Sequence, residues 1–151
     1  MLLPEPDQTI LCRRDEIISA LKRFVPAGAV IDDDTTMAAY DTDGLSAYRN
    51  QPLVVVLPET TQQVAAVMKW CRDNDVKIVP RGAGTSLSGG AIPLADGVLM
   101  GLGKFNQILD IDFSNRTVTA QPGVTNLGIT QAVQDEGFYY APDPSSQIAC
   151  S

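Results

Sequence analysis

The run Pro80-Arg81-Gly82-Ala83-Gly84-Thr85-Ser86-Leu87-Ser88-Gly89-Gly90 decides how this chain is interpreted. It follows a strand-like apolar segment, residues 76–79, and holds four glycines, three hydroxyl residues and one Arg. Glycine allows positive φ and a close approach of the backbone to a ligand. Successive N–H groups in such a loop can converge on an anion, and Ser and Thr hydroxyls add donors. We therefore predict a loop that wraps a phosphate or pyrophosphate, with an ordinary glycine-rich connection as the alternative.

Two familiar phosphate-binding motifs do not match this run. A Walker loop ends in Gly-Lys followed by Ser or Thr, whereas Gly90 is followed by Ala91-Ile92-Pro93. A Rossmann fingerprint has Gly-x-Gly-x-x-Gly at the start of a helix, and here Leu87 occupies the third glycine position. The glycines and the proline that follow would not sustain a helix. A bound phosphate would therefore be held by the backbone of the loop itself.

The composition is that of a globular domain. The chain has 151 residues, of which 44% are hydrophobic and 19% charged, enough for one domain with its own core. The formal net charge is −7 and no basic stripe occurs, so nucleic-acid binding is not expected. No apolar run reaches the length of a membrane span. The first residues also lack the basic start and the apolar stretch of a secretory signal.

The chain contains no histidine, the usual general base near neutral pH and the commonest metal ligand. Chemistry would then come from a bound cofactor, from carboxylates or Tyr, or from residues outside the chain. Cys12, Cys71 and Cys150 are far apart and form no Cys-x-x-Cys pair. This pattern favours free thiols in a reducing cytoplasm and disfavours a metal cluster. Cys71 falls on the apolar face of a predicted helix, where core packing is expected.

The first half of the chain begins with helical patterns. Residues 15–25 predict an amphipathic helix that ends at Pro26 and Gly28. Three aspartates, residues 32–34, precede a short predicted helix over residues 35–40. We interpret these aspartates as a solvated, acidic helix start rather than as a cation site, because Asp favours the first turn of a helix.

A strand–helix–strand unit follows. Residues 53–57 form a continuous apolar run, which predicts a strand buried on both faces. Thr60, with Gln63 three residues later, predicts a capped helix that runs to about residue 74. The strand at residues 76–79 completes the unit. This order indicates a right-handed parallel crossover.

After the glycine-rich run the pattern changes to short strands joined by turns. Residues 97–102, 107–112 and 116–121 predict strands of an antiparallel sheet, with a turn at Ser114-Asn115 between the last two. The pattern then predicts a helix over residues 125–136, with a capping Thr at its start and a Gly directly after it.

Three loops now stand in order along the chain: Arg81 to Ser86, Gln121 to Val124 and Pro142 to Ser146. Spaced by a β-ribbon and a helix, they resemble the loops of the FAD-binding domain of the vanillyl-alcohol-oxidase/p-cresol-methylhydroxylase flavoproteins. Within that superfamily the chain is similar to the flavoprotein subunits of glycolate oxidase, near the D-lactate dehydrogenases. Residues 40–52 and 139–151 are the most similar, and the resemblance covers nearly the whole chain.

The resemblance implies an α+β fold of the PCMH type. A small parallel β-α-β subdomain would occupy about residues 1–80. The incomplete start of a mainly antiparallel subdomain would occupy about residues 81–151, and FAD would lie between the two. The substrate domain, the histidine-rich substrate or metal site of the family and the rest of the FAD domain would lie beyond residue 151.

The resemblance also gives each loop a role at the cofactor. The first loop would wrap the FAD pyrophosphate, mainly through N–H groups, the second would border the cofactor through its backbone, and the third would line its extended path. The FAD-binding residues implied in this way are Arg81, Gly82, Ala83, Gly84, Thr85, Ser86, Leu87, Ser88, Pro122, Gly123, Val124, Pro142, Asp143, Pro144, Ser145, Ala149 and Ser151. Other roles stay open for three of them: Arg81 pairing with an internal carboxylate, Asp143 as a turn residue, and Pro144 stiffening the turn.

One departure from the family pattern bears on the attachment of the cofactor. Relatives that attach FAD covalently often carry a His after the glycine-rich trio, where this chain has Thr85, so the FAD is expected to be non-covalent. No catalytic residue and no metal ligand is assigned, and the isolated chain is expected to be inactive. Tyr48 and Arg49 are candidates to meet a carboxylate substrate, because Arg pairs bidentately with carboxylates, but a surface or interdomain contact is favoured.

The activity implied by the resemblance is FAD-dependent oxidation of a 2-hydroxy acid, with glycolate to glyoxylate the favoured case. Electrons would leave through partner subunits of a glycolate oxidase complex, one of them an iron–sulfur protein. The enzyme would be cytoplasmic, peripheral to the inner membrane through those partners. Three alternatives remain open: a flavoenzyme acting on D-lactate, a peptidoglycan-precursor reductase that takes electrons from NADPH, and a non-catalytic flavin-binding fragment.

Overall fold

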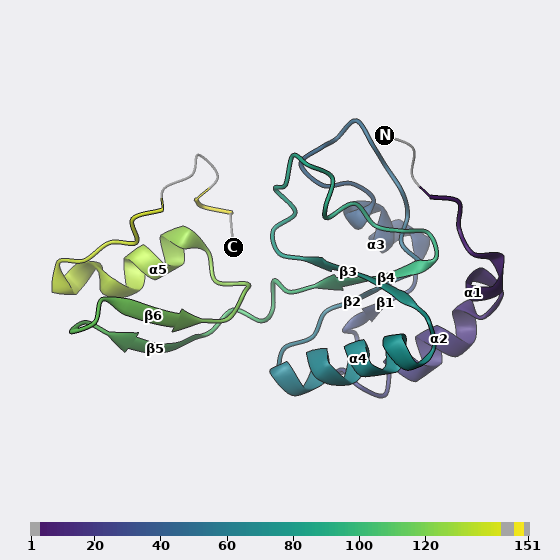
Figure 1. Cartoon of the computed structure of the whole chain (residues 1–151), viewed down its shortest axis with the longest axis horizontal. Coiled ribbons are helices and arrows are strands. Elements are labelled where there is room, and N and C mark those ends of the chain that lie inside the picture. The colour runs from purple at the N-terminus through teal and green to yellow at the C-terminus, as the bar shows by residue number, and fades with distance from the viewer. Residues whose placement is uncertain (1–3, 143–146, 150–151) are drawn as a thin grey trace.

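The computed structural model describes residues 4–142 and 147–149, and within them the larger part is built on a four-stranded sheet (Figure 1). The strand order is β1-β2-β4-β3. Strand β1 is antiparallel to β2, and β4 is parallel to both β2 and β3. These strands are β1 (Val30–Ile31), β2 (Val54–Val56), β3 (Lys77–Arg81) and β4 (Gly97–Gly101).

Strand β2 is buried on both faces, as its continuous apolar run predicts. Val54 and Val56 pack into the larger cluster of core residues, whereas Val55 packs with Met37 and Leu99 on the opposite face. Side chains alternate across a strand, so one strand serves both layers. The helices that cover the larger cluster are α1 (Gln8–Cys12), α2 (Arg14–Leu21) and α4 (Thr61–Asp73), while α3 (Asp34–Met37) contributes to the other face.

The prediction that residues 97–102 begin the antiparallel part was wrong. They form β4, which lies between β2 and β3 and pairs parallel with both: Val98 stands opposite Val54 on one side and Ile78 on the other. All five residues of β4 are buried. Its apolar run, Val98-Leu99-Met100, is the mark of a central strand covered on both faces. The parallel arrangement of β2, α4 and β3 is confirmed, but β4 separates the two strands.

Strand β3 continues into the glycine-rich run and ends at Arg81, so the first two residues of that run are strand. It lies at the edge of the sheet. An edge strand tolerates a residue without an N–H donor, which accounts for Pro80. The carboxyl ends of β3 and β4 lie together, where Leu102 donates its N–H to the carbonyl of Arg81 at 2.8 Å.

The helix starts follow the predicted capping. The Thr60 hydroxyl accepts the N–H of Gln63 at 3.2 Å, and the Gln63 side chain accepts the N–H of Glu59 at 2.7 Å. Asp33 accepts the N–H of Thr36 at 2.8 Å, so the aspartate run starts a helix as interpreted. Helix α1 was not predicted, and α2 ends at Leu21 rather than at residue 25. A turn closed by hydrogen bonds to residues three positions earlier replaces its last predicted turn.

The smaller part of the chain is the predicted antiparallel ribbon with one helix (Figure 1). Its turn is closed by Asp112, whose side chain accepts the N–H of Asn115 at 3.0 Å. Gly137 adopts φ 77° directly after the helical segment, the left-handed conformation expected of a helix stop. The elements are β5 (Ile108–Asp112), β6 (Thr117–Ala120), α5 (Asn126–Val133) and the 3-10 turn Gln134–Glu136; a further 3-10 turn, Ala38–Tyr40, follows α3.

The cysteines in the described part of the chain are free thiols. Cys71 is fully buried in the core, as predicted, and this burial raises its pKa to about 11. Cys12 is exposed. Among the helices described, none has the length and apolar character needed to cross a membrane.

Asp96, directly before β4, is one of two buried charged side chains among the described residues. Its carboxylate accepts hydrogen bonds from the Lys77 ammonium at 2.6 Å and from the Asp7 N–H at 2.8 Å. The second of these bonds fastens the N-terminal segment to the sheet. Burial of the carboxyl opposes its ionisation. The hydrogen bonds from Lys77 and Asp7 outweigh that cost and hold the pKa of Asp96 below its usual value.

We expect Asp96→Asn to lower the free energy of unfolding at neutral pH by about 1–3 kcal/mol, because two donors lose a charged acceptor. Because the pKa of Asp96 is lowered in the folded state, its carboxylate stabilises the fold at pH values above the unfolded pKa of about 3.9. This stabilisation is lost as the pH falls through the folded pKa. Urea unfolding from neutral pH into the acid range checks this. The difference between the variant and the unsubstituted chain should shrink with acid, and a constant difference would contradict the assignment.

Candidate functional site

The glycine-rich loop leaves the sheet at the carboxyl end of β3. Gly84 has φ 72° and Gly89 has φ 77°, the left-handed region that a side chain disfavours. Ala83, Thr85, Leu87 and Ser88 are exposed. Within the part of the chain that the structure describes, the N–H groups of residues 83–87 make no hydrogen bond to the protein. The loop therefore presents consecutive unpaired donors, which an anion-binding nest requires.

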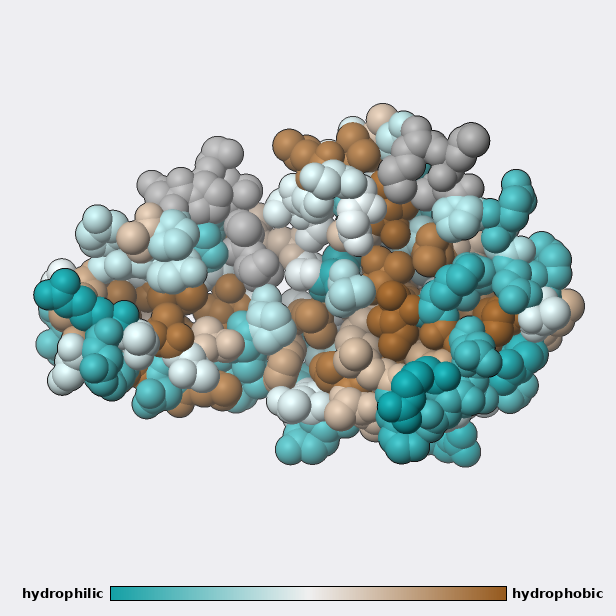
Figure 2. Space-filling model, in the orientation of Figure 1, coloured by the Kyte–Doolittle hydropathy of each residue, from teal (hydrophilic) through white to brown (hydrophobic). Residues whose placement is uncertain are grey.

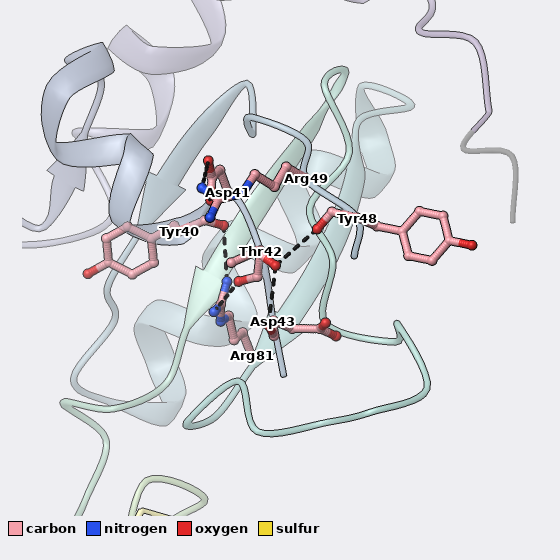
Figure 3. A network of polar contacts seen from close by, with 7 residues as sticks. All are labelled: Tyr40, Asp41, Thr42, Asp43, Tyr48, Arg49 and Arg81. Atoms are coloured by element: carbon pink, nitrogen blue, oxygen red, sulfur yellow. Dashed lines mark hydrogen bonds and ion pairs between the residues drawn. The ribbon is translucent and has the colours of Figure 1, made fainter. Parts of the chain in front are cut away.

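The Arg81 side chain turns back onto the protein (Figure 3). Its guanidinium donates to the carbonyl of Tyr40 at 3.0 Å and to that of Thr42. It also lies against Gly84, because a Cβ placed there would fall 2.5 Å from the guanidinium nitrogens. These hydrogen bonds go to backbone carbonyls rather than to the internal carboxylate considered above. A direct contact of Arg81 with the cofactor stays a prediction.

Residues 41–45, the brace segment, contact the loop at several points. The Gly44 N–H donates to the carbonyl of Gly84 at 2.7 Å. A Cβ at Gly44 would meet the carbonyl oxygens of Ser86 and Thr85 at 2.7 and 2.8 Å, so the two backbones touch. Asp43 is only 6% exposed. Sequence reasoning used these residues for the resemblance but gave them no role at the site, although the Asp-Gly pair was a signal for a tight turn.

The second predicted loop is tied to the same corner of the sheet. The Gly123 N–H donates to the carbonyl of Phe105 at 2.8 Å, and Phe105 donates in turn to Leu102 at 2.9 Å. A Cβ at Gly123 would collide with the carbonyl oxygens of Leu102 and Phe105. The N–H of Leu102 in turn donates to the carbonyl of Arg81. The turn after β4 therefore connects the Pro122–Val124 loop to the start of the glycine-rich loop. Only glycine fits at this junction.

Residues 138–142, which lead into the third predicted loop, run alongside α5 (Figure 1). The Asn126 side chain donates to the carbonyl of Pro142 at 3.5 Å, and the Leu127 N–H donates to Gln147 at 3.2 Å. Both contacts lie at the start of α5, directly after the Pro122–Val124 loop, so Pro142 and Gln147 lie close to the end of the second loop. Ala149 is exposed in a turn. The remaining predicted residues, Asp143, Pro144, Ser145 and Ser151, lie outside the described residues.

Arg49 has a surface partner in the structure. Its guanidinium pairs with Asp41 at 3.2 Å, and its side chain is 67% exposed. Tyr48 extends away from Arg81 (Figure 3), and its carbonyl accepts the Thr42 hydroxyl at 2.9 Å. This geometry agrees with the surface contact favoured for these two residues. Among the residues described, no group of three or more His, Cys, Asp or Glu side chains could hold a metal ion.

A hollow of about 510 Å³ lies apart from the loops, between the β5–β6 ribbon and the segment running from α5 to residue 141. Its lining includes the apolar side chains Ile111, Ile129, Val133 and Phe138. Figure 2 shows hydrophobic surface between these elements. None of the predicted FAD-binding residues that the structure describes lines this hollow, so it is not the predicted pyrophosphate site.

Comparison with known sequences identifies the family of the chain. Residues 52–151 match a family described as FAD binding domain. The chain is 49% identical over 149 residues to the glycolate oxidase subunit GlcD of Escherichia coli K12, covering 99% of this chain and 29% of the relative. It is 39% identical over 115 residues to GlcD of Bacillus subtilis (76% and 24% covered) and 34% over 135 residues to a D-lactate dehydrogenase of Anaerostipes hadrus (89% and 28%). The chain spans less than a third of each relative.

Solved structures show the same fold. Alkyldihydroxyacetonephosphate synthase superposes with a TM-score of 0.80 at 20% identity, covering 99% of this chain and 29% of that one. The p-cresol methylhydroxylase with substrate bound gives 0.73 at 22% identity, covering 90% and 27%. The predicted α+β fold of the PCMH type is confirmed. The chain therefore belongs to the FAD-binding domain family of the flavoproteins, and FAD is its cofactor.

Proposed function

We propose that this chain forms part of the FAD site of an FAD-dependent 2-hydroxy acid oxidoreductase that converts glycolate to glyoxylate. The observation that carries the proposal is the unpaired series of N–H groups at residues 83–87, in a chain half identical to a glycolate oxidase subunit. Bound FAD supplies the two-electron acceptor for the hydrogen on the α-carbon of the substrate. The residues of this chain bind and orient that group.

The loop fits a pyrophosphate in three respects. Its donors are backbone N–H groups, which suit an anion without requiring a basic side chain. Its bulk is small between Gly82 and Ser86, so the backbone can approach closely. The exposed Thr85 hydroxyl adds a donor that makes no hydrogen bond within the described part of the chain. Residues 81–88 would hold the pyrophosphate, and residues 122–124, 142–145, 149 and 151 would border the rest of the cofactor.

Two further features complete the proposal. The FAD is non-covalent, since the chain has no histidine and Thr85 stands where a histidyl link would form. The electrons pass to partner subunits of a glycolate oxidase complex, including an iron–sulfur protein, and the isolated chain does not turn over. A second candidate is oxidation of D-lactate, which the likeness to a D-lactate dehydrogenase favours.

The absorbance spectrum of the purified chain tests the cofactor assignment. We expect flavin bands, and we expect intact FAD in the supernatant after denaturation, identified by chromatography against FAD, FMN and riboflavin. A chain that is colourless and takes up no added FAD would contradict the proposal. Flavin that stays with the denatured protein would show that the attachment is covalent, and would leave the assignment of a flavin cofactor intact.

A paired substitution within the loop tests the pyrophosphate assignment. Gly84→Ala places a methyl group at positive φ and against the guanidinium of Arg81, which two backbone carbonyls hold in place. Gly90→Ala meets no heavy atom within 4 Å and is the matched control. We expect the first to raise the FAD dissociation constant more than tenfold, equivalent to about 1.4 kcal/mol, and the second to change it less than about twofold on the same scale. Equal affinities in two folded variants would refute the assignment.

A further inference from the structure

Asp43 is a buried carboxylate whose hydrogen-bond partners are backbone groups. It is 6% exposed, and none of the ion pairs among the described residues involves it. Its side chain is directed away from the guanidinium of Arg81 (Figure 3). Buried Asp is rare unless its oxygens are satisfied. Here one oxygen accepts the Leu45 N–H at 2.8 Å and the other accepts the Ala91 N–H at 3.3 Å.

The two donors lie in different parts of the chain. Leu45 is two residues away, so its bond shapes the brace segment itself. Ala91 is 48 residues away and directly follows the glycine-rich run, so its bond fastens the far end of the loop. The near end is fastened by the guanidinium of Arg81 on Tyr40 and Thr42. The loop is thus held at both ends by residues 40–45.

The middle of the loop faces the same segment through its carbonyls. The Gly84 carbonyl accepts the Gly44 N–H, and the carbonyls of Thr85 and Ser86 lie against Gly44. Consecutive carbonyls on one side leave the N–H groups on the other side, as in a nest of alternating backbone conformations. The brace segment therefore decides which side of the loop presents donors.

From this arrangement we propose that Asp43 is a positioning residue: it makes no contact with FAD and holds the glycine-rich loop in its pyrophosphate-binding conformation. The inference rests on the function proposed above. A loop freed at Ala91 would populate the binding conformation for only part of the time, and the apparent dissociation constant rises in inverse proportion to that fraction. Asn does not replace Asp here, because its amide group would place a donor against one of the two N–H groups.

Asp43→Asn tests the proposal against a matched control, Asp96→Asn, which removes a buried carboxylate at the other end of the parallel strands. Two quantities are measured in each folded variant: the FAD dissociation constant by fluorescence titration, and amide hydrogen exchange of residues 82–91 without FAD. For Asp43→Asn we expect the dissociation constant to rise about tenfold and exchange at Ala91 to become at least about tenfold faster. For Asp96→Asn we expect lower stability but unchanged affinity and loop exchange.

Each outcome decides a separate point. Unchanged affinity and exchange in Asp43→Asn overturn the proposal while leaving the FAD assignment intact. Equal loss of affinity in both aspartate variants also overturns it, because the effect would then be one of general stability. If the unsubstituted chain takes up no FAD, the proposed function is wrong, and so is the proposed effect of Asp43 on FAD binding. The amide hydrogen exchange rates still show in that case whether Asp43 holds the loop.

A second substitution guards against a variant that does not fold. Gly44→Ala keeps the carboxylate but places a methyl group 2.7 Å from the carbonyl oxygen of Ser86 and 2.8 Å from that of Thr85. We expect weaker FAD binding with the Ala91 bond still protected from exchange. Wild-type affinity in this variant would contradict the claim that the brace segment sets the conformation of the loop.

Discussion

A loop that binds an anion through its backbone must keep its N–H groups unpaired while it stays ordered. Glycine makes the second requirement harder, because it loses more conformational entropy on ordering than any other residue. In this chain the contact between the brace segment and the glycine-rich loop resolves the conflict. Gly44 binds the Gly84 carbonyl and lies against those of Thr85 and Ser86, while the N–H groups of residues 83–87 make no hydrogen bond within the described part of the chain. The end of β3 and the turn after β4 then place the Pro122–Val124 loop at the same corner.

The charged side chains beside the loop bind backbone groups rather than each other. Arg81 donates to two carbonyls, and Asp43 accepts from two N–H groups. Each charge therefore satisfies polar groups that would otherwise be buried at a cost. The guanidinium has a further consequence, because it touches Gly84 and so places a positive charge next to the predicted anion site. Through-space attraction of this kind favours a bound pyrophosphate without a direct contact.

How much of this could be predicted from the sequence depended on the range of the interactions. The buried strand at Val54–Val56, the Thr60 and Asp33 caps and the β5–β6 ribbon all follow from local periodicity or turn chemistry, and the structure has them. Strand β4 was assigned to the wrong sheet because its partners, Val54 and Ile78, are far away in sequence and its neighbouring turns resemble those of a meander. Asp43 was missed for the same reason. Its decisive bond spans 48 residues and leaves no local pattern.

Backbone recognition also bears on substrate choice. N–H groups that bind a pyrophosphate recognise the negative charge of the cofactor. They do not contribute to the choice of the acid that is oxidised. One such loop is therefore compatible with relatives named for glycolate and for D-lactate. A bidentate Arg is one specific way to recognise the carboxylate of a 2-hydroxy acid. Among the described residues near the loop, Arg49 is engaged with Asp41 at the surface, and Arg81 is engaged with backbone carbonyls. Under the proposed function, the described loops would bind the cofactor, and their backbone donors would not distinguish one 2-hydroxy acid from another.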